Sequence, residues 1–240
     1  MIEIGVTITG ADDGVDPIVL DEIGREFPFV EWGILFSKSR EGEPRYPTAA
    51  WRERFYWATN DRGEYYTTAA HLCGKSVDAF LASYGHLQNE VTMGYNAIQF
   101  NRLTAENKDQ IFQVAADAQS TVIVQYSKNT DILLNGLFDE DVPEDLFILL
   151  DDSGGKGISW KQTGFPNIPE PWASRMAVGY AGGVNEDNIE ELVLGLIHCN
   201  KDSNGGLWID LESGARTEDK FDIDKVIRIL EKVKAGGEDQ

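Results

Sequence analysis

Three stretches of the chain decide its fold: Phe147–Asp151 (FILLD), Met176–Gly183 (MAVGYAGG) and Leu207–Gly214 (LWIDLESG). Each is a short apolar run that ends in a carboxylate or a glycine, and an amphipathic helical segment follows the last two. Parallel strands that are buried on both faces are apolar throughout, and in barrels their carboxyl ends carry the chemistry while helices wrap the outside. The three stretches therefore predict parallel strands with a site at their carboxyl ends.

The same pattern extends over the whole chain. Eight strand-like segments can be identified, at Ile4–Thr9, Glu31–Phe36, Tyr65–Cys73, Tyr95–Phe100, Thr121–Tyr126, Phe147–Asp151, Met176–Ala181 and Leu207–Leu211. Eight strand–helix units in 240 residues are typical of an α/β fold with a single (β/α)8 TIM barrel. We expect the barrel to span residues 1–234 and residues 235–240 to form a frayed tail. A doubly wound open sheet is the rival fold, but it places its glycine-rich turn after the first strand, whereas here the glycines cluster late.

Helix signals vary along the chain. Asp16 followed by Pro17 predicts a helix start, because aspartate caps a helix and proline suits its first turn. The fifth unit is the weakest, since residues 131–137 offer barely two turns. The segment 160–172 is interrupted by prolines and is predicted to be a loop.

The composition limits the class of protein. There are 41 Asp and Glu residues against 21 Lys and Arg, and the net charge of −20 repels nucleic acids and anionic membranes. No run approaches the roughly 20 apolar residues of a membrane span, and residues 1–6 lead into the first strand without the basic stretch and apolar segment that are typical of a leader. Cys73 and Cys199 do not form a disulfide framework. We expect an acidic cytoplasmic protein, a monomer or homodimer, with no nucleic-acid or membrane partner.

Glycine-rich turns follow the last three strands. They lie at 154–157, at Gly182–Gly183 and at Ser213–Gly214. Backbone amides in such turns can hold a phosphate, and barrels build phosphate sites from their last loops. The candidate ligand-binding residues are therefore Gly155, Lys156, Gly182, Gly183, Ser213 and Gly214, with a phosphorylated small molecule as ligand. The alternative is that glycine only lets the chain turn from strand into helix.

These residues carry a resemblance to phosphoribosylanthranilate isomerase, a barrel enzyme of tryptophan biosynthesis. The sixth strand of that family ends in Leu-Leu-Asp before a Gly-Gly-x-Gly loop, matched here at Leu149–Asp151 and Gly154–Gly157. Its seventh strand ends in Gly-Gly, as at Gly182–Gly183, and its eighth reads Val-Asp-Val-Ser-Ser-Gly, matched by Ile209–Gly214. Asn96–Phe100 is similar to its fourth strand. The resemblance implies an isomerase of the intramolecular oxidoreductase type that needs no cofactor and no metal.

The chain also departs from the family. The family's general base is a cysteine of the first strand, and Thr9 occupies that position. A threonine hydroxyl does not release its proton near neutral pH, whereas a thiol can. Glu212 and Arg216 replace a serine and the glutamate of the last motif, and Asn101 replaces a histidine. The original isomerase activity is therefore predicted to be absent or very slow.

Four residues are candidates for catalysis. Asp151 ends a buried apolar strand, where a carboxylate is costly unless it faces the mouth of the barrel, and together with the resemblance this makes it the candidate general acid or base. The second group is left open among Thr9, His71 and Cys73. His71 and Cys73 share one strand face, and either could replace the lost base or be a packed core residue.

Arg45, Gln99, Asn101 and Asp210 are further polar candidates for ligand binding, at strand ends and loops. The sequence predicts an enzyme that acts on a phosphorylated, sugar-derived small molecule by acid/base chemistry. The alternative is a non-catalytic barrel that senses a phosphorylated ligand or serves as an assembly partner. The missing first-strand cysteine favours the alternative, while Asp151 and the glycine turns favour the enzyme.

Overall fold

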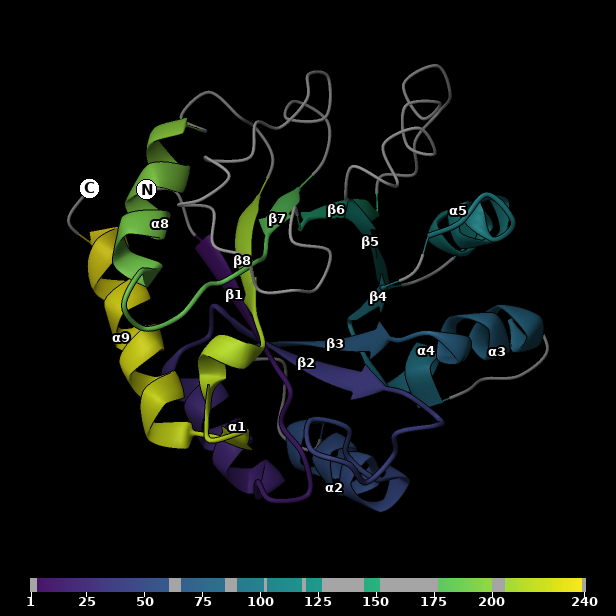
Figure 1. The fold of residues 1–240 in the computed structure, drawn as a ribbon, viewed down its shortest axis with the longest axis horizontal. Helices are drawn as coiled ribbons and strands as arrows, with labels where there is room; N and C mark the ends of the chain where they lie inside the picture. Colours follow the sequence, from purple (N-terminus) through teal and green to yellow (C-terminus); the bar gives the residue numbers. More distant parts are fainter. Residues whose placement is uncertain are drawn as a thin grey trace.

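Eight parallel strands close into one barrel, β1 to β8 in chain order, with helices outside it (Figure 1). The computed structural model describes residues 4–60, 66–84, 90–101, 103–117, 120–126, 145–151, 177–199 and 206–238. The (β/α)8 barrel predicted from the sequence is confirmed. The predicted helix at 131–137 and the predicted loop at 160–172 lie outside the described residues.

The strand bounds follow the predicted ones closely. The strands are β1 (Ile4–Thr9), β2 (Val30–Phe36), β3 (Thr67–Leu72), β4 (Ala97–Phe100), β5 (Thr121–Tyr126), β6 (Leu146–Leu150), β7 (Val178–Tyr180) and β8 (Leu207–Leu211). Cys73, Asp151 and Ala181 were predicted inside strands but are the first residues after them. The amides of Cys73 and Asp151 still donate to Phe36 and Tyr126 of the neighbouring strands, at 3.0 Å each. The side chains of Cys73 and Asp151 therefore keep the alternation of their strands.

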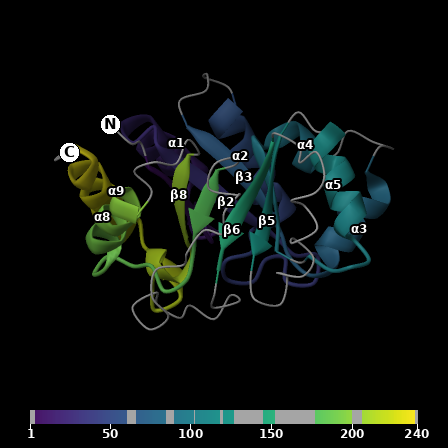
Figure 2. The same cartoon turned by 90° about the horizontal axis from the view of Figure 1, so that it is seen from above.

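The helices are α1 (Pro17–Glu26), α2 (Ala49–Asn60), α3 (Lys75–Ser83), α4 (Glu90–Gly94), α5 (Lys108–Asp117), α8 (Ile189–Cys199) and α9 (Ile223–Glu238). Asp16 caps α1 as predicted, because its carboxylate accepts a hydrogen bond from the amide of Ile18 at 3.2 Å. In Figure 2, α8 and α9 lie on one flank of the barrel and α3, α4 and α5 on the opposite flank. No helix among the described residues combines the length and the apolar character that crossing a membrane requires.

Some features of the chain end differ from expectation. Helix α9 continues to Glu238, whereas the sequence predicts a frayed tail from residue 235. Within the helix, Gly236 packs against Val193 of α8, so this part of α9 has a packing partner. Before α9, a short 3-10 helix, η3 (Ser213–Ala215), leads into a small hairpin of β9 (Arg216–Thr217) and β10 (Lys220–Phe221).

The barrel has two apolar layers, separated by the strand alternation. Outward side chains such as Ile8, Ile34 and Ile98 pack against the helices in the main core. A second cluster fills the inside of the barrel, with Ala69, Ala97, Ile123 and Leu149 buried and with Phe147, Ala181 and Trp208 packed against them. A Cβ at Gly179 would collide with the indole of Trp208, so this ring depends on glycine at the neighbouring strand. These apolar side chains fill the barrel interior, and the polar side chains lie at the mouth of the barrel, at the carboxyl ends of the strands.

Candidate functional site

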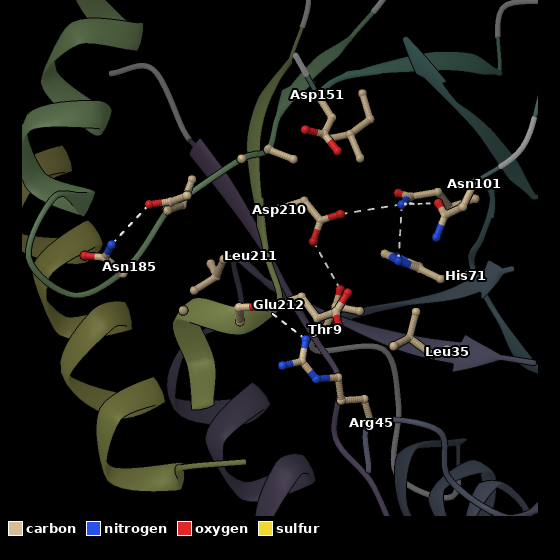
Figure 3. A pocket seen from close by; sticks show the side chains of 18 of the residues that line it. Thr9, Leu35, Arg45, His71, Asn101, Asp151, Asn185, Asp210, Leu211 and Glu212 are labelled. Carbon is tan, nitrogen blue, oxygen red and sulfur yellow. Dashed lines mark hydrogen bonds and ion pairs between the residues drawn. The ribbon is translucent and has the colours of Figure 1, made fainter. Parts of the chain in front are cut away.

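A cavity of about 1150 Å³ lies at the carboxyl ends of the strands (Figure 3). It is lined by every predicted site residue that the structure describes. These residues are Thr9, Arg45, His71, Cys73, Gln99, Asn101, Asp151, Gly182, Gly183, Asp210, Ser213 and Gly214. Gly155 and Lys156 lie outside the described residues. The barrel thus brings together residues from β1, β3, β4, β6, β8 and the loops after β2, β7 and β8.

Strand alternation and register explain why these side chains meet. On β3, Ala69 belongs to the inner cluster while Ala70 and Leu72 belong to the outer core, so His71 points into the barrel. His71 pairs in register with Gln99 of β4. His71 and Cys73 therefore line the same cavity as Asp151.

Asp210 is the centre of a hydrogen-bonded group in the mouth (Figure 3). The Thr9 hydroxyl donates to Asp210 Oδ1 at 3.1 Å, and Gln99 Nε2 lies 3.5 Å from Oδ2. Gln99 Nε2 also donates to Asn101 Oδ1 at 2.8 Å. Burial raises the pKa of the Asp210 carboxyl from 3.8 to about 7, and the nearby charge of Glu212 adds to this rise, while the hydrogen bonds from Thr9 and Gln99 oppose it. Both the protonated and the ionised state of Asp210 are therefore populated near neutral pH.

Burial has different consequences for His71 and Cys73. It lowers the pKa of His71 to about 3, so the ring is neutral at physiological pH. Gln99 Nε2 lies 3.2 Å from His71 Nδ1, and His71 Nε2 is buried without a partner among the described residues. Burial raises the pKa of the Cys73 thiol to about 11, and its Sγ accepts a hydrogen bond from Asn101 Nδ2 at 3.4 Å. Near neutral pH, His71 is a weak base and Cys73 stays a thiol.

Asp151 faces the cavity from the end of β6, while Asp210 faces it from β8 (Figure 3). Asp151 is 4% exposed, and its side chain accepts a hydrogen bond from Gln125 Nε2 at 2.7 Å. Sequence reasoning did not assign Gln125 to the site. The signal was available, because Gln125 lies two residues after the inward-facing Ile123 on β5 and so shares its face. Asp152 lies outside the described residues.

The two glycine turns touch each other. A Cβ at Gly214 would collide with the carbonyl oxygen of Val184, so only glycine allows this approach. Gly182 and Gly183 have φ of 107° and 62°, in the region that favours glycine. The Gly183 carbonyl accepts from Asn185 Nδ2 at 3.1 Å and from Asn188 Nδ2 at 2.9 Å. Within the described part of the chain, the amides of Gly182, Gly183, Ser213 and Gly214 donate to no other group.

Backbone amides just before α8 already have hydrogen-bond acceptors. The amide of Asn185 donates to the side chain of Asn188 at 2.9 Å, and the amide of Asp187 donates to the side chain of Asn185, also at 2.9 Å. These amides are already capped. An oxyanion at this position would therefore bind to the turns themselves rather than to the first turn of α8.

Charged groups surround the turns. Arg45 Nη1 donates to Glu212 Oε1 at 2.6 Å and to Ser213 Oγ at 3.1 Å, and Nη2 donates to Asp219 Oδ1 at 2.8 Å. Arg45 has φ of 77°, and its amide donates to Asp12 Oδ2 at 2.9 Å. The carboxylates of Asp151, Glu186, Asp187, Asp210 and Glu212 line the cavity together with the cations Arg45 and Lys225. Among its described lining residues the cavity is therefore net acidic.

Arg216 has a structural role. Its side chain is 3% exposed, it donates to the carbonyl oxygens of Gly10 and Asp219, and it forms an ion pair with Asp12 at 3.0 Å. It does not line the cavity. Arg216 thus ties the loop after β1 to the hairpin after β8. Among the described residues, no group of three or more His, Cys, Asp or Glu side chains is arranged to hold a metal ion.

Known structures share this fold. A phosphoribosylanthranilate isomerase in complex with reduced 1-(o-carboxyphenylamino)-1-deoxyribulose 5-phosphate is similar with a TM-score of 0.60 and 17% identity, over 97% of this chain and 99% of that chain. The monomers generated from the dimeric isomerase of Thermotoga maritima match with a TM-score of 0.57 and 14% identity, over 96% and 98% of the two chains. The phospho-2-dehydro-3-deoxyheptonate aldolase of Thermotoga maritima matches with a TM-score of 0.57 and 10% identity, over 99% of this chain and 70% of that one.

Sequence comparisons add no family assignment. No protein-family model matches the chain, and no curated protein matches it. At these identities the structural likeness shows a phosphoribosylanthranilate isomerase-like barrel, and the activity has to be argued from the site.

Proposed function

We propose that the protein is an enzyme that isomerises a phosphorylated, sugar-derived small molecule by acid/base proton transfer at the mouth of the barrel. The observation that carries this proposal is the placement of two buried carboxyls, Asp151 and Asp210, on one cavity next to two touching glycine turns. A pair of titratable groups supports proton transfer, and unpaired amides support the binding of an oxyanion.

The phosphate would bind to the turns in spite of the acidic surroundings. The amides of Gly182, Gly183, Ser213 and Gly214 have no other acceptor among the described residues. Arg45 lies beside Ser213 and balances the charge of Glu212. Local amide dipoles act at hydrogen-bond distance, whereas the net charge of the protein acts at long range and is screened by salt.

An isomerisation of this class uses two proton transfers. The base takes a proton from a carbon next to a carbonyl or imine group, and the electron pair of that C–H bond forms a carbon–carbon double bond. The acid gives a proton to the oxygen or nitrogen that receives the displaced electrons, which yields an enol or enamine. Return of a proton to the other carbon completes the isomerisation without net oxidation. Asp151 would supply one of the two transfers.

Binding of inorganic phosphate tests the proposed phosphate site at the two glycine turns. We expect saturable shifts of the Gly182, Gly183, Ser213 and Gly214 amide signals in NMR spectra during a phosphate titration in 0.1 M salt. Gly42 and Gly74, which also have positive φ but do not line the cavity, serve as internal controls and should not shift. Shifts confined to other parts of the protein would contradict the phosphate site.

Activity separates the enzyme from the non-catalytic alternative. Phosphoribosylanthranilate is the first substrate to assay, through the loss of its fluorescence. We expect its isomerisation to be absent or slower by about 10² to 10⁴ than with an intact acid/base pair, because Thr9 stands where the family has its base. Turnover at about 1 to 10³ per second would show that another residue is an efficient base. Phosphate binding without proton transfer to any sugar phosphate would favour the sensor.

A further inference from the structure

The proposed function leaves one role unassigned, namely the group that works opposite Asp151. Thr9, His71 and Cys73 all line the cavity, but each is engaged in a way that does not suit proton transfer. We infer that Asp210 is this second proton-transfer group, and that Thr9 is a positioning residue which orients the Asp210 carboxyl. The inference rests on the proposed function and deepens it.

The hydrogen bond between Thr9 and Asp210 assigns their roles. The Thr9 hydroxyl is the donor, and Asp210 Oδ1 is the acceptor, at 3.1 Å. If Thr9 acted as a base it would have to lose this proton beside a carboxylate, which would place two negative charges together in a buried site. The same hydrogen bond keeps Asp210 in a defined orientation. Thr9 therefore supports a carboxylate base and is a poor base itself.

The surroundings of His71 and Cys73 do not suit proton transfer, although both residues line the cavity. A Cβ at Gly33 would lie 2.9 Å from His71 Nε2, so this nitrogen points at the wall formed by β2. The other nitrogen, Nδ1, faces Gln99 Nε2 at 3.2 Å. The Cys73 Sγ accepts from Asn101 Nδ2. Their pKa values, lowered for His71 and raised for Cys73 by burial, disfavour both as bases near neutral pH.

Asp210 has the placement and the environment that the role requires. It lies on β8, near the end of the strand, and faces the same cavity as Asp151, the first residue after β6 (Figure 3). Thr9 and Gln99 contact it from β1 and β4, and the charges of Glu212 and Glu31 raise its pKa further. A pKa of about 7 suits proton transfer at neutral pH, because both protonation states are then populated.

The transfer is balanced without any additional reactant. Ionised Asp210 takes the proton from the carbon, the C–H electron pair becomes the new carbon–carbon double bond, and Asp151 supplies a proton to the heteroatom. Protonated Asp210 can then return its proton to the neighbouring carbon as that double bond is lost, while the hydroxyl on the first carbon gives its proton to ionised Asp151 and becomes the new carbonyl. Both carboxyls thereby return to their starting states.

Titration of the carboxyl tests the inference without a substrate. Carbon-13 NMR of protein labelled at the aspartate carboxyl carbons follows each signal with pH, and Asp210→Asn identifies the Asp210 signal by its loss. We expect a midpoint near 7 in the wild type and a higher midpoint in Thr9→Val, because the hydrogen bond that favours the ionised form is lost. Thr7→Val is the matched control, since Thr7 donates to Glu31 instead, at 2.9 Å. An Asp210 midpoint near the ordinary 3.8 would overturn the inference.

Hydrogen exchange of a probe tests the chemistry. The probe is 1-(o-carboxyphenylamino)-1-deoxyribulose 5-phosphate, whose C1 hydrogens lie next to its C2 carbonyl and are replaced by deuterium from D₂O when a base acts. We expect wild-type exchange to rise with pH through about 7. Asp210→Asn should exchange the probe about 10²- to 10⁴-fold more slowly than the wild type. Thr9→Val should shift the midpoint of the pH dependence of exchange upward. Thr7→Val should not shift the midpoint upward, because Thr7 donates to Glu31 and not to Asp210. A merely structural role of Thr9 would not move this midpoint.

The outcomes distinguish a failure of the proposed function from a failure of the assignment of Asp210. If neither inorganic phosphate nor the probe shifts the Gly182 and Gly183 amide signals, the proposed function is wrong, and the exchange arm counts against Asp210 as well. If the probe binds and Asp210→Asn exchanges it as fast as the wild type does, the assignment of Asp210 is overturned while the proposed function stands with another base. Exchange lost in Asp210→Asn with binding retained supports both.

Discussion

The Asp210→Asn variant should be more stable than the wild type at alkaline pH, because asparagine keeps the shape of the side chain but cannot ionise. The pKa of Asp210 is raised from 3.8 in the unfolded reference to about 7 in the fold by burial. Between these values the folded protein holds a proton that the unfolded chain has released. Since the folded state binds more protons, the contribution of Asp210 to stability falls as pH rises through this window.

The magnitude follows from the size of the shift. One pKa unit corresponds to about 1.4 kcal/mol, so a shift of roughly three units amounts to about 4 kcal/mol in full. About 2 kcal/mol of this is lost between pH 5.5 and 7, and none is lost above about pH 8. His71 has the opposite slope, because burial lowers its pKa from 6.5 to about 3 and the unfolded state then binds the extra proton. The difference between variant and wild type removes this shared contribution.

Urea unfolding followed by tryptophan fluorescence at pH 5.5, 6.5, 7.5 and 8.5 measures the effect. We expect the free energy of unfolding of Asp210→Asn, relative to the wild type, to increase by about 2 kcal/mol from pH 5.5 to 8.5. Asp222→Asn is the control that should show no change over this pH range, because a hydrogen bond from Thr217 lowers the pKa of Asp222 from its ordinary 3.8 and the carboxyl is ionised in both the folded and the unfolded state. A difference that stays constant with pH, or that decreases, would refute the account of Asp210.

Three further changes have expected outcomes. His71→Gln should gain stability relative to the wild type as pH falls from 7.5 to 5.5, because the fold keeps His71 neutral; pH-dependent unfolding measures this. Gly214→Ala should lower the free energy of unfolding, measured with urea, by about 1–3 kcal/mol and weaken phosphate binding, because its Cβ would collide with the Val184 carbonyl. The Cβ of Gly74→Ala would meet no atom within 4 Å, and this variant should keep phosphate binding. Arg216→Met should lose about 3 kcal/mol in the same assay, because it leaves Asp12 without its buried partner.

The barrel could be predicted from the sequence because its signals are local. A strand buried on both faces must be apolar along its whole length, and Leu207–Leu211 and Phe147–Leu150 show this without any knowledge of their neighbours. The cap at Asp16 and the glycine turns are local as well, since they depend on backbone geometry within a few residues. The strand ends differed from prediction at Cys73 and Asp151, where the ladder ends but the last amide still bonds to the neighbouring strand.

Much of the site could also be predicted, because the mouth of a parallel barrel collects the residues at its strand ends. Asp151, Gly182 and Gly214 were found in this way. Gln125 was missed although its alternation with Ile123 marked it. The role of Arg216 could not be found, because its partners Gly10 and Asp12 lie about two hundred residues earlier in the chain, at separations of 206 and 204.

The sequence by itself thus determined the barrel, the end of the barrel that carries the site, and which residue types reach it, because each depends on periodicity and turn chemistry along the chain. Only the tertiary structure decided which side chains contact one another within the mouth. Thr9 and Asp210 are separated by 201 residues, and their hydrogen bond exists only because β1 pairs with β8 to close the barrel. The burial that moves the pKa of Asp210 toward neutrality and those of His71 and Cys73 away from it is a property of the assembled interior, where low polarity disfavours charge.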